Sequence, residues 1–365
     1  MAPRIHVLEG ALVDQIAAGE VVERPASVVK ELVENALDAG ATRVDVDIAD
    51  GGRARIRVSD DGSGMDREDA ARAVLRHATS KIREVDDLLA LTTLGFRGEA
   101  LPSIASVSRF SLKTRPEAEV AGTEVRIEGG AAPVVRDVGC AAGTSVTVED
   151  LFFNVPARRK FLRAAQSESG RILGVCLAAA LGAPALHLTV TSNGRKARAY
   201  LPARDWFERA ETTFADEPLE RIEATRDGVG VRAALGPPER ARSGARYLHL
   251  FVNGRPVSDR ALARAVAFAY GSVLPPGRYP AGVVHLDLEP QRVDVNAHPQ
   301  KAEVRFAGGR IVHDALTRAL ASRLGTEAWS GAGRGPVARS PSYWDERLGG
   351  LAHAAPTAAE RTATP

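Results

Sequence analysis

The sequence predicts an α+β protein, a helix-and-sheet sandwich rather than a series of alternating βαβ units. An amphipathic helix is followed directly by a β-hairpin, and further strand patterns cover residues 122–127 and 144–148. A second α/β unit begins after about residue 204. The 365 residues also fit about two domains of roughly 150 residues each.

The first helix is predicted over residues 28–39, directly after Ser27. Gly40 follows it, and glycine at this position is a common stop signal for a helix. The apolar positions recur at helical spacing and form one stripe, which consists of Val29, Leu32, Val33, Ala36 and Leu37.

The hairpin comes next along the chain. Residues 43–48 and 54–58 alternate with period two on either side of Asp50-Gly51-Gly52. Residues 67–77 are predicted to form another helix. The later elements are a helical stretch after Gly98 with Pro102 in its first turn, a strand over 247–252 that enters the Asn253-Gly254 turn, a helix over 262–270, a strand over 283–288 and a helix over 311–324.

The charge pattern divides the chain, although the formal net charge is only +2. Residues 1–150 carry 18 basic and 26 acidic side chains, whereas residues 151–330 carry 26 basic and 17 acidic ones. The later part therefore offers a surface to an anion, with chance clustering as the alternative. The tail from Ser330 onward is rich in small residues and is predicted to be a disordered linker.

Cysteine usage and hydropathy favour the cytosol. Cys140 and Cys176 cannot build a disulfide framework and have no metal-ligand spacing. The N-terminus lacks the pattern of a signal peptide, and the longest apolar run, over 173–188, is interrupted too often to span a bilayer. We therefore expect a cytoplasmic protein with no membrane partner.

The polar side of the first helix carries three oxygen-bearing side chains. Glu31, Asn35 and Asp38 stand at i, i+4 and i+7, so they share one face. A carboxylate can take a proton from water, and a nearby amide oxygen can coordinate Mg²⁺. The alternative interpretation is an ordinary solvated polar face.

Two glycine-containing segments fit a nucleotide. Asp60-Asp61-Gly62-Ser63-Gly64 follows a predicted strand, where a buried carboxylate can bind an exocyclic amine and the glycines can approach a flat ring. Gly95 and Gly98 precede a helical stretch, which leaves backbone N–H groups free for phosphate. The first segment is also typical of a plain turn, and the second of a lid hinge.

Some functions are excluded, and nucleic acid is indicated. No lysine follows a glycine, so the chain contains no P-loop, and it contains no H-E-x-x-H motif. Residues 156–163 hold four closely spaced cations, and residues 232–264 hold seven arginines against two acids. Such stretches are typical of proteins that bind phosphate backbones without reading bases, or of a solvated basic surface.

Taken together, these residues resemble the MutL family of mismatch-repair proteins. This family lies in the GHKL ATPase superfamily of gyrase, the large heat-shock chaperones and the histidine kinases. The resemblance covers about residues 4–325. It is carried by four stretches in the right order, namely 15–35, Gly95-Phe-Arg-Gly-Glu-Ala-Leu101, Pro156-Ala-Arg-Arg-Lys-Phe-Leu162 and His298-Pro-Gln-Lys301.

The resemblance implies a Bergerat-type ATP-binding α/β sandwich over 1–203, a ribosomal-protein-like α/β transducer domain over 204–328 and a linker over 329–365. It implies ATP and Mg²⁺ as cofactors, with Glu31 as the general base and Asn35 as the Mg²⁺ ligand. Asp60 then binds the adenine amine, with Gly62 and Gly64 beneath the ring, and Lys301 senses the γ-phosphate. The remaining implied nucleotide-site residues are Met65, Thr79, Ser80, Lys81, Gly95, Phe96, Arg97, Gly98, Glu99, Ala100, Leu101 and Thr144, and the implied DNA contacts are Arg159, Arg260 and Arg310.

The implied activity is an ATP-gated clamp. ATP and Mg²⁺ order a lid, two chains close into a homodimer, double- or single-stranded DNA is held beneath, and hydrolysis resets the clamp. The implied partners are a MutS-type mismatch sensor and a downstream nuclease and helicase. Family members continue past the linker into a dimerisation domain that often carries a nicking site, so we expect no endonuclease site in this chain. The alternative function is a non-hydrolysing ATP- and DNA-binding scaffold.

Overall fold

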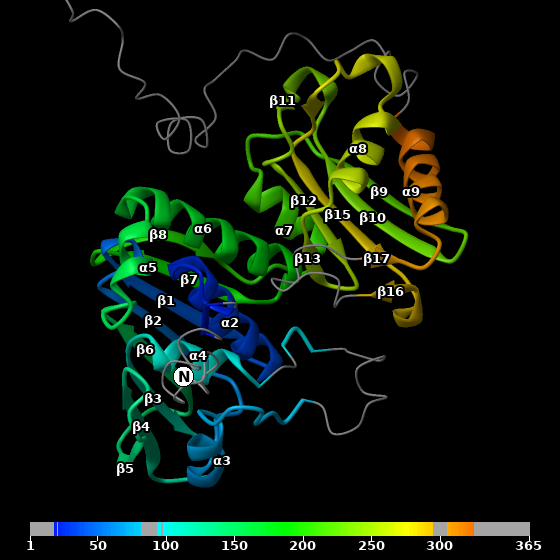
Figure 1. Cartoon of the computed structure of the whole chain (residues 1–365). Helices are drawn as coiled ribbons and strands as arrows, with labels where there is room; N and C mark the ends of the chain where they lie inside the picture. The colour runs from blue at the N-terminus through cyan, green and yellow to red at the C-terminus, as the bar shows by residue number, and fades with distance from the viewer. Residues whose placement is uncertain (1–17, 20, 82–92, 96–97, 295–304, 325–365) are drawn as a thin grey trace, which may run out of the picture. The chain divides into compact units, whose positions relative to one another are not determined.

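The structure is a computed structural model of the chain (Figure 1). It describes residues 18–19, 21–81, 93–95, 98–294 and 305–324. These residues form one eight-stranded sheet, one five-stranded sheet and two small two-stranded sheets. The tail predicted to be a linker lies outside the described residues, and the domain boundary at residue 203 stays a prediction.

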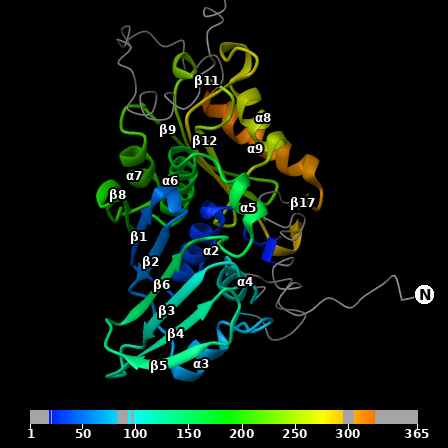
Figure 2. The ribbon, with the colours of Figure 1, turned by 60° about the vertical axis from the view of Figure 1, so that its left-hand side comes forward.

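The eight-stranded sheet has the strand order β5-β4-β3-β6-β2-β1-β7-β8, and its central strands run side by side in Figure 2. Its neighbouring strands are antiparallel except for β1 and β7, which pair in parallel. The mixed sheet confirms the predicted α+β class. The strands are β1 (Arg43–Ala49), β2 (Arg55–Asp60), β3 (Arg109–Arg115), β4 (Gly122–Glu128), β5 (Val134–Val138), β6 (Gly143–Glu149), β7 (His187–Ser192) and β8 (Arg195–Tyr200).

Helices α2 (Pro25–Asp38), α4 (Ala100–Ser106) and α6 (Ala165–Gly182) pack on this sheet, and α2 also packs against α4 and α6. Every second residue of β1 is buried, as the period-two pattern predicts. Val33 of α2 and Ile172 of α6 are almost fully buried against this core. Burying such side chains contributes about 1.5–3 kcal/mol each, so the apolar stripe of α2 fixes which face of the helix stays polar.

Helix α2 starts three residues before the predicted Val28. Pro25 opens it, which is favourable because the first helical residue needs no N–H partner. The predicted end is confirmed. The Gly40 N–H donates to the carbonyl of Leu37, and the Ala41 N–H donates to that of Ala36, which is the hydrogen-bond pattern of a Schellman motif.

One sequence-based prediction needs correction, and several elements were not predicted. The helix expected over 67–77 is α3 (Arg67–Arg72), followed by a turn in which the Leu75 N–H donates to the Arg72 carbonyl. His77 adopts a φ of 61°, which a helix cannot continue through. Helix α6 and strands β3, β5, β7 and β8 were not predicted.

The five-stranded sheet has the order β13-β12-β15-β10-β9. Helices α8 (Arg260–Ala269) and α9 (Gly309–Leu324) cover one face with a continuous apolar core. The predicted Asn253-Gly254 turn joins β12 to β13, both residues having positive φ. The remaining bounds are β9 (Glu220–Arg226), β10 (Val229–Leu235), β11 (Arg242–Ser243), β12 (Leu248–Val252), β13 (Arg255–Val257), β14 (Arg278–Tyr279), β15 (Gly282–Asp287), β16 (Val293–Asp294), β17 (Arg305–Phe306), α5 (Pro156–Phe161) and α7 (Trp206–Thr213).

Candidate nucleotide site

A cavity of about 1450 Å³ opens over the polar side of α2. Helix α2, the end of β2, β6 and the segments around residues 63–81 and 93–101 all contribute to its lining. Most of the residues predicted to bind nucleotide line it, namely Glu31, Asn35, Asp60, Gly64, Met65, Thr79, Ser80, Lys81, Gly95, Gly98, Glu99, Ala100, Leu101 and Thr144. Residues from widely separated parts of the chain therefore meet in one space.

The polar face of α2 holds a cation in this structure. The Lys81 ammonium donates to Asn35 Oδ1 at 2.8 Å and to Asp38 Oδ2 at 2.6 Å. The Lys81 charge shows that these oxygens suit a positive group. No cluster of three or more His, Cys, Asp or Glu side chains able to hold a metal occurs among the described residues. Mg²⁺ needs only one or two protein ligands when a triphosphate supplies the others, so Asn35 fits such a role.

Asp38 lines the cavity and shares a helix face with Glu31 and Asn35, but it was not among the residues predicted to bind nucleotide. Its side chain is 7% exposed, and its two oxygens accept the backbone N–H groups of Leu94 and Gly95 at 2.8 and 3.0 Å. Asp38 thus joins Lys81 and the 93–95 segment to α2. Its place on the Glu31–Asn35 face was visible in the sequence, but its partners lie more than 40 residues away.

Asp60 ends β2 beside Thr144 of β6, its cross-strand partner. Its Oδ1 accepts the Gly62 N–H at 2.9 Å. Burial raises the pKa of Asp60, against the opposing effect of backbone hydrogen bonds from Gly62 and Thr144. A half-buried acceptor at the end of a strand can bind an exocyclic amine. Gly62 does not line the cavity, but its backbone N–H holds the Asp60 carboxylate in place.

A threonine pair fixes the next segment. The Met65 N–H donates to Thr114 Oγ1 at 2.9 Å, and the Thr114 and Thr144 hydroxyls lie 3.0 Å apart. At Gly64 a Cβ would lie 2.3 Å from the Arg115 carbonyl oxygen, so only glycine allows this close approach. Thr114 is fully buried and was missed because β3 was not predicted.

Glu99 joins two lining segments. Its carboxylate lies 2.7 Å from His77 Nδ1 and 3.6 Å from Arg76, and it is the N-cap residue of α4. Pro102 lies within the first turn of this helix, as predicted. Glu99 therefore connects the turn that follows α3 to the start of α4.

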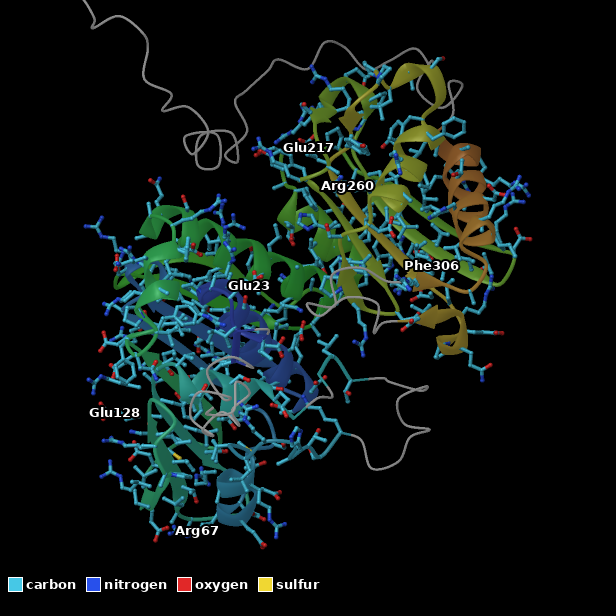
Figure 3. All side chains as sticks on the ribbon, viewed as in Figure 1. Glu23, Arg67, Glu128, Glu217, Arg260 and Phe306 are labelled. Carbon is cyan, nitrogen blue, oxygen red and sulfur yellow. The ribbon has the colours of Figure 1, made fainter. Side chains whose placement is uncertain are left out.

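The three arginines predicted to contact DNA do not line the cavity. Phe96, Arg97 and Lys301 lie outside the described residues. The three arginines predicted to contact DNA occupy exposed positions on three different helices, Arg159 on α5, Arg260 on α8 and Arg310 on α9. Figure 3 labels Arg260 at the start of α8. Within the described residues, no helix is long and apolar enough to cross a membrane.

Comparison with known proteins identifies the family. Residues 23–129 match the family described as "Histidine kinase-, DNA gyrase B-, and HSP90-like ATPase", and residues 210–325 match "DNA mismatch repair protein, C-terminal domain". The DNA mismatch repair protein MutL of Anaeromyxobacter dehalogenans (strain 2CP-C) is 52% identical over 99% of this chain and 59% of its own length. That of Xylella fastidiosa (strain M12) is 48% identical over 96% of this chain and 59% of its own length.

Solved structures agree with this result. The Aquifex aeolicus MutL ATPase domain complexed with ADP is 33% identical, covers 74% of this chain and 94% of its own chain, and has a TM-score of 0.59. The B-subunit of the DNA gyrase from Myxococcus xanthus shares the fold, with a TM-score of 0.57 at 15% identity over 86% of this chain and 95% of its own. The chain spans a little over half the length of the curated relatives. With a GHKL ATPase fold and these relatives, the chain belongs to the MutL family of DNA mismatch repair proteins.

Proposed function

We propose that this chain is the Mg²⁺-dependent ATPase part of a mismatch-repair protein and hydrolyses ATP to ADP and phosphate. The observation that carries the proposal is the single cavity in which Glu31 and Asn35 of α2 meet Asp60 and Thr144 of the sheet. A related MutL ATPase domain was solved with ADP, which supports a nucleotide as the ligand.

The adenine end of the nucleotide binds at Asp60. Its carboxylate accepts the exocyclic amine, while Gly62 holds that carboxylate and Gly64 and Met65 lie beneath the ring. The phosphates lie along two segments, where backbone N–H groups and Lys81 supply donors. The first segment consists of Thr79, Ser80 and Lys81. The second consists of Gly95, Phe96, Arg97, Gly98, Glu99, Ala100 and Leu101. Lys301 contacts the γ-phosphate.

Glu31 acts as the general base. Its carboxylate orients the attacking water and takes its proton, and its half-buried position on the cavity wall suits that role. Asn35 Oδ1 supplies the protein ligand to Mg²⁺, which when bound neutralises phosphate charge. Lys81 already contacts Asn35 and Asp38, so it gives up or shares this position when nucleotide binds.

The ATPase works as a clamp on DNA in the bacterial cytosol. Nucleotide favours a closed homodimer because it binds that state more tightly than the open one. Arg159, Arg260 and Arg310 contact the backbone of double- or single-stranded DNA without reading bases. The clamp couples a MutS-type mismatch sensor to a downstream nuclease and helicase.

The test is the variant Glu31→Ala. We expect ATP turnover to fall at least about 100-fold while the affinity for a non-hydrolysable ATP analogue changes little, because a general base contributes mainly to the chemical step. Glu23→Ala is the matched control, since Glu23 is an exposed acid just before α2 that pairs with Arg24. Phosphate release and equilibrium binding are measured on both variants.

The same experiment separates the two functions. Unchanged turnover in Glu31→Ala removes Glu31 as the base. A wild-type chain that binds the analogue but releases no phosphate above background supports the non-hydrolysing scaffold instead.

A further inference from the structure

Arg255 of β13 reaches from the five-stranded sheet to the rim of the cavity. Its guanidinium donates to the backbone carbonyl of Thr93 and, at 3.5 Å, to that of Leu94. The residue is 8% exposed, so this is a buried charge. Buried arginines need partners, and Arg255 donates to two backbone oxygens of the segment that precedes Gly95 on the cavity wall.

The same segment is held from its other side by Asp38. Leu94 and Gly95 donate their N–H groups to the Asp38 carboxylate, while Thr93 and Leu94 offer their carbonyls to Arg255. Thr93 also donates its hydroxyl to the Gly95 carbonyl at 2.8 Å. An anion on α2 and a cation on β13 therefore bind opposite polar groups of one short stretch of backbone.

Electrostatics supports this arrangement. Burial lowers the pKa of Arg255, and the negative charges of Glu34 and Asp38 on α2 oppose that effect. Arginine stays protonated in proteins, so the charge persists and is stabilised by the helix that carries Glu31 and Asn35. Arg255 thus interacts with both the segment and the helix that form the nucleotide site.

We propose that Arg255 is a positioning residue that couples the five-stranded sheet to the nucleotide site by fixing the Thr93–Gly95 backbone. The proposal rests on the proposed ATPase function. Gly95 takes its place on the cavity wall only while Asp38 and Arg255 both hold the segment. A change in the position of β13 then alters nucleotide binding without any contact between Arg255 and the nucleotide.

The experiment compares Arg255→Met with Arg255→Lys and with a matched control, Arg232→Met. Arg232 lies on β10 of the same sheet and pairs with Asp287 in an exposed position. Residue-resolved hydrogen exchange of the nucleotide-free chain follows the Leu94 and Gly95 amides, with the Val46 amide of β1 as the reference for global unfolding. Affinity for a non-hydrolysable ATP analogue and turnover are measured on the same samples.

In Arg255→Met we expect Leu94 and Gly95 to exchange at least about tenfold faster while Val46 is unchanged. Analogue affinity falls by a similar factor and turnover falls with it. Arg255→Lys gives an intermediate effect, because one ammonium cannot serve two carbonyls as well as a guanidinium. Arg232→Met leaves all three readouts at the wild-type level.

Two results overturn the proposal. One is unchanged exchange at Leu94 and Gly95 in Arg255→Met. The other is a parallel rise at Leu94, Gly95 and Val46, which marks Arg255 as a residue of general stability. A wild-type chain without ATP hydrolysis defeats the ATPase proposal alone, because the exchange and analogue-binding readouts do not require turnover.

Discussion

His285 is a buried histidine that the nucleotide site does not use. It lies on β15, its ring stacks on Phe251 with centroids 4.7 Å apart, and Trp206 approaches it edge-on. Its Nε2 has no hydrogen-bond partner among the described residues. Burial first, and the nearby Arg232 second, lower the pKa of His285 to about 4. The folded protein therefore keeps this ring neutral at pH values where the unfolded chain protonates it.

This difference predicts acid sensitivity. At pH 7.5 the ring is neutral in both states and contributes nothing. Between about pH 6.5 and 4 only the unfolded state takes up the proton, so stability falls by up to about 1.4 kcal/mol per pH unit. In His285→Phe, which keeps the stacking on Phe251, we expect the stability lost between pH 7.5 and 5 to be smaller by about 2 kcal/mol. Urea unfolding at the two pH values measures it, and equal losses in both proteins would refute the assignment.

Also at the scale of single residues, the sequence predicted cavity residues that a local pattern marks. It missed those whose position depends on partners far away in the chain. Helical spacing placed Glu31 and Asn35 on one face, and Asp60 stood after a predicted strand. All three line the cavity. Thr114 and Arg255 gave no signal, because each is defined by a contact with a segment far away in the sequence. Asp38 lies between these cases, since its face was predictable and its partners Lys81, Leu94 and Gly95 were not.

At the scale of elements, periodicity predicted those that have one exposed and one buried face. Helix α2, strands β1 and β2 and helix α8 are of this kind, and each was found with its end within a few residues. Helix α6 was missed because small and apolar residues occur on most of its sides. Its sequence therefore shows no apolar stripe at helical spacing. The helix predicted over 67–77 was too long, because α3 ends at Arg72. Beyond it, Arg76 and His77 contact Glu99, which lies more than 20 residues later in the sequence.

The junction of β2 and β6 allows a test at this scale. Gly143 begins β6 with a φ of 101°, and a Cβ there would lie 2.1 Å from the Asp60 carbonyl oxygen. We expect Gly143→Ala to destabilise the fold by about 2–5 kcal/mol, from backbone strain and overpacking together. Gly139→Ala is the control, because a Cβ there meets no atom within 4 Å, and it should stay within about 0.5 kcal/mol. Urea unfolding compares them, and similar stabilities would show that β2 moves aside freely.

For the whole molecule, the charge asymmetry visible in the sequence agrees with the placement of the arginines. The acidic part, residues 1–150, contains most of the predicted nucleotide site, and the basic part contains Arg159, Arg260 and Arg310 at exposed positions. We therefore expect an anionic polymer to be attracted to the basic part rather than to the acidic part. The sequence could not predict how β13 meets the cavity, because that contact depends on the packing of two regions about 160 residues apart.

Nucleotide-dependent self-association is the prediction that tests the clamp as a whole. If the triphosphate binds the closed dimer more tightly than the open monomer, it shifts the equilibrium toward the dimer by the ratio of those affinities, and a ligand with equal affinity shifts nothing. We expect sedimentation to show a species of 38.7 kDa without nucleotide and twice that mass with Mg²⁺ and a non-hydrolysable ATP analogue. Arg255→Met should need more analogue to reach the same dimer fraction, because its cavity wall is less well held. A monomer under saturating analogue, with binding confirmed, would reject nucleotide-gated closure for residues 1–365 and leave the ATPase proposal to be judged by Glu31→Ala alone.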